Sequence, residues 1–154
     1  MKRRTILISL ATLFAGVAAG LAADANIGTW KLNEAKSKLA PGGVKNNTVV
    51  YEAAGDQVKI TVDGTDAEGK AVHHEWTGKY DGKDYPVVGD STSDTRSYTK
   101  IDDHTLTFTA KKGSKTIVTG RVVVSADGKS RTVTTSSTDS KGKEARSTAV
   151  YDKQ

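Results

Sequence analysis

The sequence predicts an all-β protein: a single antiparallel up-and-down β-barrel of about eight to ten strands, with one short helix after the first strand. After residue 25 the chain holds 14 valines and 18 threonines but only three leucines, and β-branched residues favour strands. Apolar and polar residues alternate in stretches such as QVKITVDG, residues 57–64, as in half-buried strands. Glycine-centred turn sequences such as Asp127-Gly128-Lys129 separate these stretches.

Taken in order, the apolar and β-branched runs give ten expected strands. Such short consecutive strands leave open edges unless the sheet closes on itself, so we expect a closed barrel. Most runs are too short for the lipid-facing strands of a membrane barrel, which favours a soluble one. The expected strands are 27–33, 46–53, 57–63, 70–80, 84–88, 95–101, 104–111, 115–125, 130–137 and 145–152.

The segment NEAKSKLAPGG, residues 33–43, interrupts the strand pattern. Asn33 can cap a short helix from Glu34 to Leu39, which Pro41-Gly42-Gly43 would end. In a barrel the segment would lie across one end as a plug or partial lid. The alternative is a plain surface loop.

The N-terminus has the order of residues found in a secretory signal peptide. Three basic residues are followed by an uncharged run from Ile6 to Ala23, and Ala23-Asp24-Ala25 forms an A-x-A cleavage site. We therefore expect a signal peptide over residues 1–25, a barrel domain over 26–154, and a periplasmic or secreted product. A retained membrane anchor is the alternative, although the run is rich in Ala and Gly and only weakly apolar.

Charge and composition exclude several classes of function. Without residues 1–25 the formal net charge falls from +5 to +3, as 20 basic and 17 acidic residues remain, and these are spread along the chain. This pattern and export argue against nucleic-acid binding. The absence of cysteine excludes disulfides, thiol catalysis and thiolate metal sites. We expect a monomer with no cofactor and no membrane insertion after signal removal.

The hexapeptide GTWKLN, residues 28–33, resembles the opening motif of the fatty-acid-binding proteins, and its Gly-x-Trp core resembles that of the lipocalins. Both families are calycins, so the resemblance implies a barrel in which Trp30 and Leu32 face inward and the indole closes the floor. In fatty-acid-binding proteins an Arg-x-Tyr pair on the last strand holds the ligand carboxylate. Tyr151 matches that tyrosine, but Ala149 replaces the arginine.

Polar and aromatic residues at inward positions are the candidates for ligand binding. Arg96 and Tyr98 are two residues apart and share one face of their strand. His74, Trp76 and Tyr80 share a face of another strand. An arginine beside a tyrosine hydroxyl would suit a carboxylate or phosphate, unless Arg96 lies on the solvent face. The full set of candidate ligand-binding residues is Trp30, His74, Trp76, Arg96, Tyr98, Phe108 and Tyr151.

No motif points to catalysis or to a resident metal. His73 and His74 are adjacent and face opposite sides of a strand, so they do not share a metal, and His104 is expected in a turn. The stretch GDSTS, residues 89–93, lacks the second glycine of a nucleophile elbow. The carboxylates of Asp63, Asp66 and Glu68 do not follow calcium-loop spacing. We therefore expect no enzyme activity and no catalytic or metal-binding residues.

Two functions remain. The first is an exported, soluble carrier whose lumen binds a small hydrophobic or amphipathic molecule, the apolar part desolvated and one or two polar groups fixing its head. The second is an envelope protein whose barrel is filled by its own side chains and whose loops bind another protein or a surface polymer. A central cavity of some hundreds of Å³ would favour the carrier.

Overall fold

The computed structural model of the protein describes residues 24–139 and 141–154. Most of the predicted signal peptide, residues 1–25, lies outside these described residues. Within them, no helix has the length and apolar character needed to cross a lipid bilayer.

All ten expected strands are present, and each begins and ends within a few residues of its predicted bounds. They are β1 (Gly28–Leu32), β2 (Lys45–Ala54), β3 (Gln57–Thr65), β4 (Ala71–Gly78), β5 (Tyr85–Val88), β6 (Thr95–Lys100), β7 (Thr105–Lys112), β8 (Lys115–Val124), β9 (Ser130–Thr138) and β10 (Glu144–Lys153).

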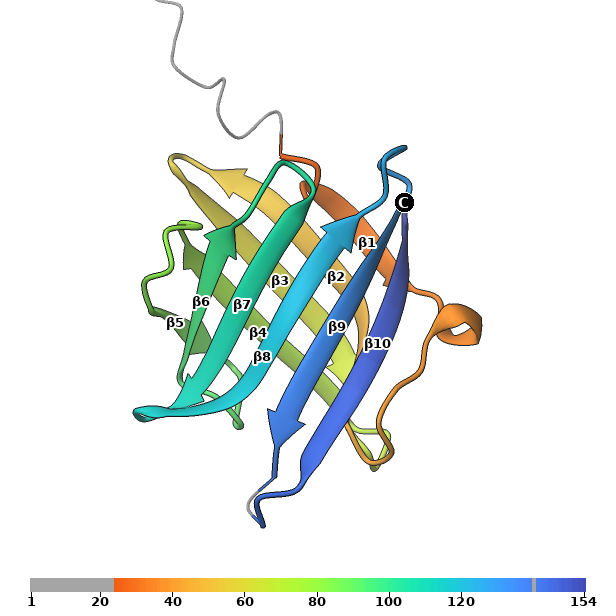
Figure 1. The fold of residues 1–154 in the computed structure, drawn as a ribbon, viewed down its shortest axis with the longest axis vertical. Helices are drawn as coiled ribbons and strands as arrows, with labels where there is room; N and C mark the ends of the chain where they lie inside the picture. The colour runs from red at the N-terminus through yellow and green to blue at the C-terminus, as the bar shows by residue number, and fades with distance from the viewer. Residues whose placement is uncertain (1–23, 140) are drawn as a thin grey trace, which may run out of the picture.

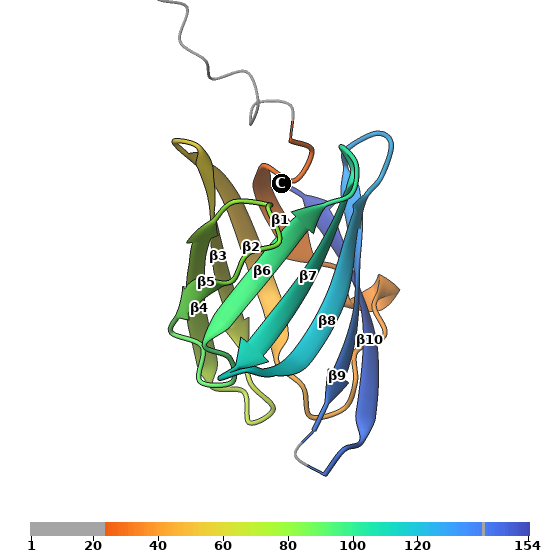
Figure 2. The ribbon, with the colours of Figure 1, turned by 60° about the vertical axis from the view of Figure 1, so that its left-hand side comes forward.

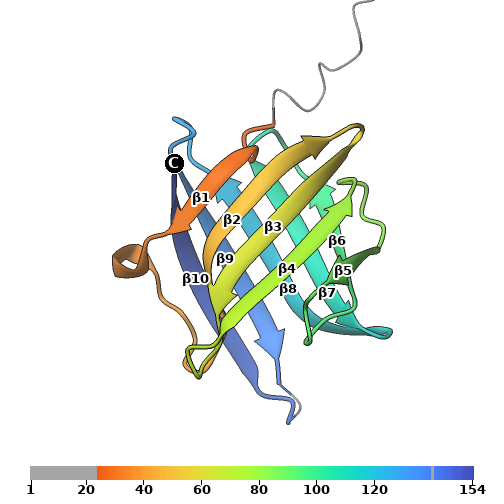
Figure 3. The ribbon, with the colours of Figure 1, turned by 180° about the vertical axis from the view of Figure 1, so that it is seen from behind.

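The strands form a closed barrel in which each pairs antiparallel with its neighbours in the chain, and β1 pairs with β10. The pair Trp30 and Lys153 and the pair Leu32 and Tyr151 lie at this closure. Figures 1 and 3 show the same barrel from opposite sides, with β6 to β10 in front in the first view and β1 to β4 in front in the second. The predicted fold class is therefore confirmed.

The barrel has two unlike ends. We call the end where β1 begins and β10 finishes the floor end; it carries residues 24–27 and the C-terminus (Figures 1 and 2). The other we call the mouth end; it carries the connection from β1 to β2 and the turn from β3 to β4. Trp30 lies at the floor end and is fully buried, with 0% of its surface exposed, as GTWKLN predicted.

Alternation places the apolar side chains inside. Along β3, Val58, Ile60 and Val62 are buried, whereas the intervening Lys59 and Thr61 are partly exposed. The pairing continues this inner row around the barrel, because Ile60 lies opposite both Tyr51 and Trp76. The core is: Trp30, Val49, Tyr51, Val58, Ile60, Val62, Trp76, Tyr98, Leu106, Val122, Val124, Ala149 and Tyr151.

The helix after β1 is shorter than expected. Only Glu34–Lys36 are helical, as a 3-10 turn, η1, whose N-terminus Asn33 caps by accepting a hydrogen bond from the Lys36 amide. The predicted helix extended to Leu39, but Lys38 instead forms a β-bridge with Thr148 on β10. The backbone groups of Lys38 gain two hydrogen bonds to β10, which a longer helix would not make.

Candidate functional site

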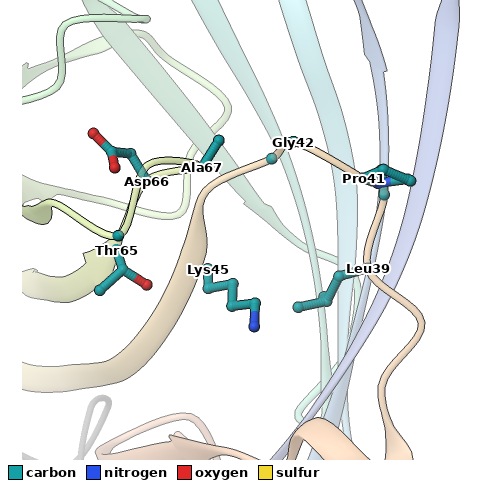
Figure 4. Close-up of a pocket in the computed structure, with 10 residues that line it drawn as sticks. Leu39, Pro41, Gly42, Lys45, Thr65, Asp66 and Ala67 are labelled. Carbon is teal, nitrogen blue, oxygen red and sulfur yellow. The ribbon is translucent and has the colours of Figure 1, made fainter.

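One hollow of the described molecule lies at the mouth end. It is a cleft of about 400 Å³ between residues 39–43 and the turn from β3 to β4. Figure 4 shows these two segments, with the side chains of Leu39 and Lys45 pointing toward one another between them. The cleft is lined by Leu39, Ala40, Pro41, Gly42, Gly43, Lys45, Thr65, Asp66, Ala67 and Gly69.

A smaller pocket of about 100 Å³ lies inside the barrel, next to the cleft. Its apolar lining comes from β1, β9 and β10, and its deepest wall includes Tyr151, which also belongs to the core. Leu39, Ala40 and Gly43 line both the pocket and the cleft, so the two spaces adjoin at this segment. The lining residues are Leu32, Leu39, Ala40, Gly43, Val44, Asn46, Val133, Thr135, Ser147, Ala149 and Tyr151.

We call residues 39–44 the lid. Next to β10 the Ala40 amide donates to the Ser147 hydroxyl over 2.9 Å, and the preceding Lys38 pairs with Thr148; at its other end the segment continues into β2 at Lys45. Beyond Ala40 the chain turns at Gly42, whose φ of +74° favours glycine. The sequence left a partial lid and a surface loop open; residues 41–44 are exposed, and each of them lines the cleft or the inner pocket.

Four of the predicted ligand-binding residues lie together on the side of the interior formed by β4, β6 and β7. They are Trp76, Arg96, Tyr98 and Phe108. Trp76 contacts Tyr98 edge to face with ring centroids 4.7 Å apart, and Tyr98 lies 5.5 Å from Phe108. The Trp76 indole donates to the Arg96 carbonyl over 2.9 Å. These rings fill the interior at their level, so they act as core whether or not they also contact a ligand.

Arg96 faces inward, against the alternative that placed it on the solvent side. Only 14% of its side chain is exposed, and its Nη2 lies 3.4 Å from Asp90 Oδ2. Asp90 also accepts hydrogen bonds from the side chains of Thr92 and Ser93 and from the Thr92 amide. Within the described residues the Arg96 Nε has no hydrogen-bond partner. Arg96 and Asp90 thus form a largely buried ion pair at the mouth end.

His74 is 7% exposed and points inward from β4. Burial, followed by the positive charge of Arg96, lowers the pKa of His74 to about 4. Its Nε2 has no hydrogen-bond partner within the part of the chain that the structure describes. His74 is therefore a neutral buried imidazole beside the Arg96–Asp90 pair. No group of three or more His, Asp or Glu residues among the described residues could hold a metal ion.

Trp30 and Tyr151 meet at the floor end around Arg131, a residue that the sequence reasoning missed. Arg131 is 2% exposed, and its guanidinium carbon lies 4.9 Å from the Trp30 ring, 4.7 Å from Tyr51 and 4.9 Å from Tyr151. Arg131 lies directly opposite Tyr151 in the sheet. The arginine missing at Ala149 is thus present on the neighbouring strand, and only cross-strand pairing could have revealed it.

The fold is calycin-like. Ten antiparallel strands close in chain order around a buried tryptophan of the first strand, which is the arrangement that GTWKLN predicted. No protein-family model matches the sequence, and the search of curated proteins also gives no match.

Solved structures resemble the chain at low sequence identity. A redesigned β-barrel bound to DFHBI is 15% identical, with a TM-score of 0.45 over 86% of this chain and 98% of that one. A second DFHBI-bound protein is 11% identical, with a TM-score of 0.48 over 86% and 97%. Apocrustacyanin C1 is 12% identical, with a TM-score of 0.41 over 85% and 62%.

Proposed function

We propose that this protein is an exported, non-enzymatic binding protein that takes a small hydrophobic or amphipathic molecule through its mouth end. The observation that carries the proposal is the pair of adjoining spaces that share three lining residues of the lid, Leu39, Ala40 and Gly43. The inner pocket alone, about 100 Å³, is below the roughly 300–1,000 Å³ of small-molecule sites. With the lid displaced, pocket and cleft form one space of that order.

The lining of the two spaces suits an amphipathic molecule. Leu32, Val133 and Ala149 offer apolar surface inside, where burial of an apolar tail is favourable by about 25 cal/mol per Å². Lys45 and Asp66 stand at the cleft, where a polar head stays near water. Lys45 is ion-paired with Glu34 over 3.0 Å, so its charge is partly balanced before any ligand arrives.

Export and a monomeric state belong to the same proposal. The order of residues 1–25 supports a signal peptide and therefore a periplasmic or secreted location. Every described strand has two hydrogen-bonded neighbours, so the barrel offers no free edge for pairing with a second copy.

A second candidate function is favoured by the filled interior. The rings of Trp76, Tyr98 and Phe108 and the Arg131 cluster occupy the floor half and one side of the barrel. A barrel with this interior can serve as a rigid support for loops that bind another protein or a surface polymer. This alternative needs no ligand in the lumen.

Native mass spectrometry of the protein purified from its own host distinguishes the two. We expect a copurified small molecule, released on denaturation, if the protein is a carrier. In a second measurement an apolar fluorescent dye such as anilinonaphthalene sulfonate is titrated into the delipidated protein. Saturable binding supports the carrier, and the absence of both signals supports the interaction module.

A matched pair of variants locates the binding. Ala149→Leu adds apolar volume directly into the inner pocket, because Ala149 lines it, and we expect dye affinity to fall about tenfold or more. Thr134→Leu places the same side chain on the exposed outer face of β9 and should leave the affinity unchanged. Equal affinities in both variants would remove the pocket from the proposal.

A further inference from the structure

Residues 24–27 complete the floor end of the barrel. The Trp30 indole Nε1 donates to the Asn26 carbonyl over 2.8 Å, and Asn26 is 1% exposed. The Ile27 amide donates to the Asp24 carbonyl over 3.1 Å, which closes a turn. Figure 2 shows this segment at the floor end, close to the C-terminus. The tryptophan that seals the floor is thus itself held by a turn that begins at Asp24.

Asp24 is the residue that holds this turn together. Its Oδ1 accepts hydrogen bonds from the Asn26 amide, over 2.9 Å, and from the Asn26 Nδ2, over 3.1 Å. Both donors belong to a buried residue, and a buried donor left without an acceptor lowers the stability of the fold. Loss of Asp24 would therefore leave two polar groups of the floor without their acceptor.

The charges near the floor add a second reason. Arg131 and Lys153 both lie over the Trp30 ring, with the Lys153 Nζ 5.2 Å from its centroid. Burial and then the nearby hydroxyl of Tyr51 raise the pKa of Tyr80, and the carboxylate of Asp24 raises it further. Asp24 thus supplies negative charge at an end of the barrel where cations surround the indole.

A chain that began at Asn26 would carry its α-ammonium group where the Asn26 amide now donates to Asp24 Oδ1. The positive charge would join Arg131 and Lys153 around Trp30, without the carboxylate that now accepts from the Asn26 amide. Burial of a charge without a partner is costly. A chain that began at Asp24 would instead carry its ammonium group on a partly exposed residue, the first of the turn.

We propose that the signal peptide is removed by a cut after Ala22 or after Ala23, so that the exported protein keeps Asp24 and Ala25 as part of its floor. The inference rests on the export part of the proposed function. The proposed cut lies N-terminal to the bond after Ala25, which is the bond that the A-x-A match of Ala23 and Ala25 predicts. Small residues precede both of the earlier bonds. A cut after Ala23 makes Asp24 the first residue, and a cut after Ala22 makes Ala23 the first residue, with Gly20 at the third position before that cut.

The test is the intact mass of the protein exported from a bacterial host that expresses the full chain. We expect a first residue of Ala23 or Asp24. A first residue of Ala25, Asn26 or any later position would overturn the inference and leave export intact. An unprocessed chain of 154 residues would overturn the inference together with the export part of the proposed function.

The variant Ala25→Val separates the two cleavage positions. A branched side chain at position 25 directly precedes the bond after residue 25 and blocks cleavage there. If the cut lies N-terminal to Asp24, the same side chain is part of the mature protein and does not affect the cut. We expect the variant to be processed at the same bond as the parent and with the same yield. Accumulation of an unprocessed or differently cut chain would contradict the inference.

A stability measurement tests the physical reason. Residues 24–154 and residues 26–154 are prepared with a cleavable tag that leaves the native first residue. We expect the shorter chain to melt several degrees lower, and Asp24→Ala in the longer chain to lower its melting temperature in the same way. Equal melting temperatures for all three proteins would show that Asp24 does not hold the floor.

Discussion

The guanidinium of Arg131 joins three aromatic side chains of the floor, those of Trp30, Tyr51 and Tyr151. Cation–π attraction is strongest where the cation is desolvated, and Arg131 is almost fully buried. Two of its nitrogen atoms, Nε and Nη1, have no hydrogen-bond partner among the described residues. The rings therefore supply most of the stabilisation that this buried charge receives.

Replacing Arg131 by alanine should lower the free energy of unfolding by about 2–4 kcal/mol, because it removes the ring contacts and leaves a cavity. Arg131→Met keeps most of the volume and removes the buried charge, so its loss should be smaller. Urea denaturation measures both. Arg121→Ala, at an exposed position of β8, is the control and should stay within about 0.5 kcal/mol of the parent. An equal loss at Arg121 would contradict the assignment.

His74 makes the stability of the barrel depend on pH. Burial and then Arg96 hold its folded-state pKa at about 4, against 6.5 in the unfolded chain. As pH falls below 6.5 the unfolded chain binds the proton first, so stability decreases until about pH 4. The loss should reach at most about 3 kcal/mol over this window. Urea titrations at a series of pH values measure it.

The His74→Gln variant should show a much flatter stability profile between pH 6.5 and pH 4. His73→Gln is the control: the exposed His73 ring lies with its Nδ1 2.6 Å from Asp63 Oδ1, and this hydrogen bond raises the pKa of His73. A raised pKa stabilises the fold at low pH, so removing His73 should not flatten the acid loss. A parent protein equally stable at pH 4.5 and pH 7 would contradict this account.

At the scale of single residues, alternation predicted which side chains enter the barrel but not what they meet there. The sequence left open whether Arg96 faces the interior or the solvent, and its partner Asp90 comes from a loop whose path the sequence did not specify. Arg131 lies in a polar stretch, SRTVTTSST, and nothing in that stretch marks it as a core residue. Its role depends on rings from β1, β2 and β10.

Among the elements, β7 and β8 are matched by shape. Phe108 lies opposite Gly120, and a Cβ at Gly120 would collide with the Phe108 ring. The Phe108 ring therefore occupies the space that a side chain at position 120 would need. A similar arrangement occurs at Gly78, where a Cβ would meet Trp76 and Tyr85 at 2.6 Å.

We expect Gly120→Ala to lower the free energy of unfolding by about 1–3 kcal/mol, since the added methyl group overpacks the interior. The double variant Gly120→Ala with Phe108→Leu should recover part of that loss, because the smaller side chain frees the space. A double-mutant cycle from urea denaturation measures the coupling. Strictly additive effects would show that the two side chains do not compete.

The element pattern was predictable because most strands are amphipathic and most turns contain a glycine. The exceptions have physical causes. Asp81-Gly82-Lys83 is another glycine-centred sequence of the hairpin kind, but it lies in a longer connection in which Asp81 bridges to Thr99 on β6. The helix after Asn33 stops at Lys36 because β10 offers hydrogen bonds to Lys38. In both places a distant strand outweighs the local preference.

For the whole molecule, closure through β1 and β10 should make unfolding cooperative. Trp30 reports on the floor and Trp76 on the aromatic cluster across the interior, while the backbone signal reports on all strands. We expect tryptophan fluorescence and far-ultraviolet circular dichroism to give coincident urea transitions. Separate midpoints would indicate that one part of the barrel opens independently.

The all-β class, the strands and their order, the inward-facing rows and the burial of Trp30 could be predicted from the sequence, because they depend on alternation and on turns a few residues long. The adjoining spaces beside the lid, the pairing of Asp90 with Arg96 and the place of Arg131 among three rings became visible only in the folded barrel. Each of these contacts joins segments whose approach is set by the curvature and register of the closed sheet. Hydrophobic periodicity carries no information about which distant strand lies opposite.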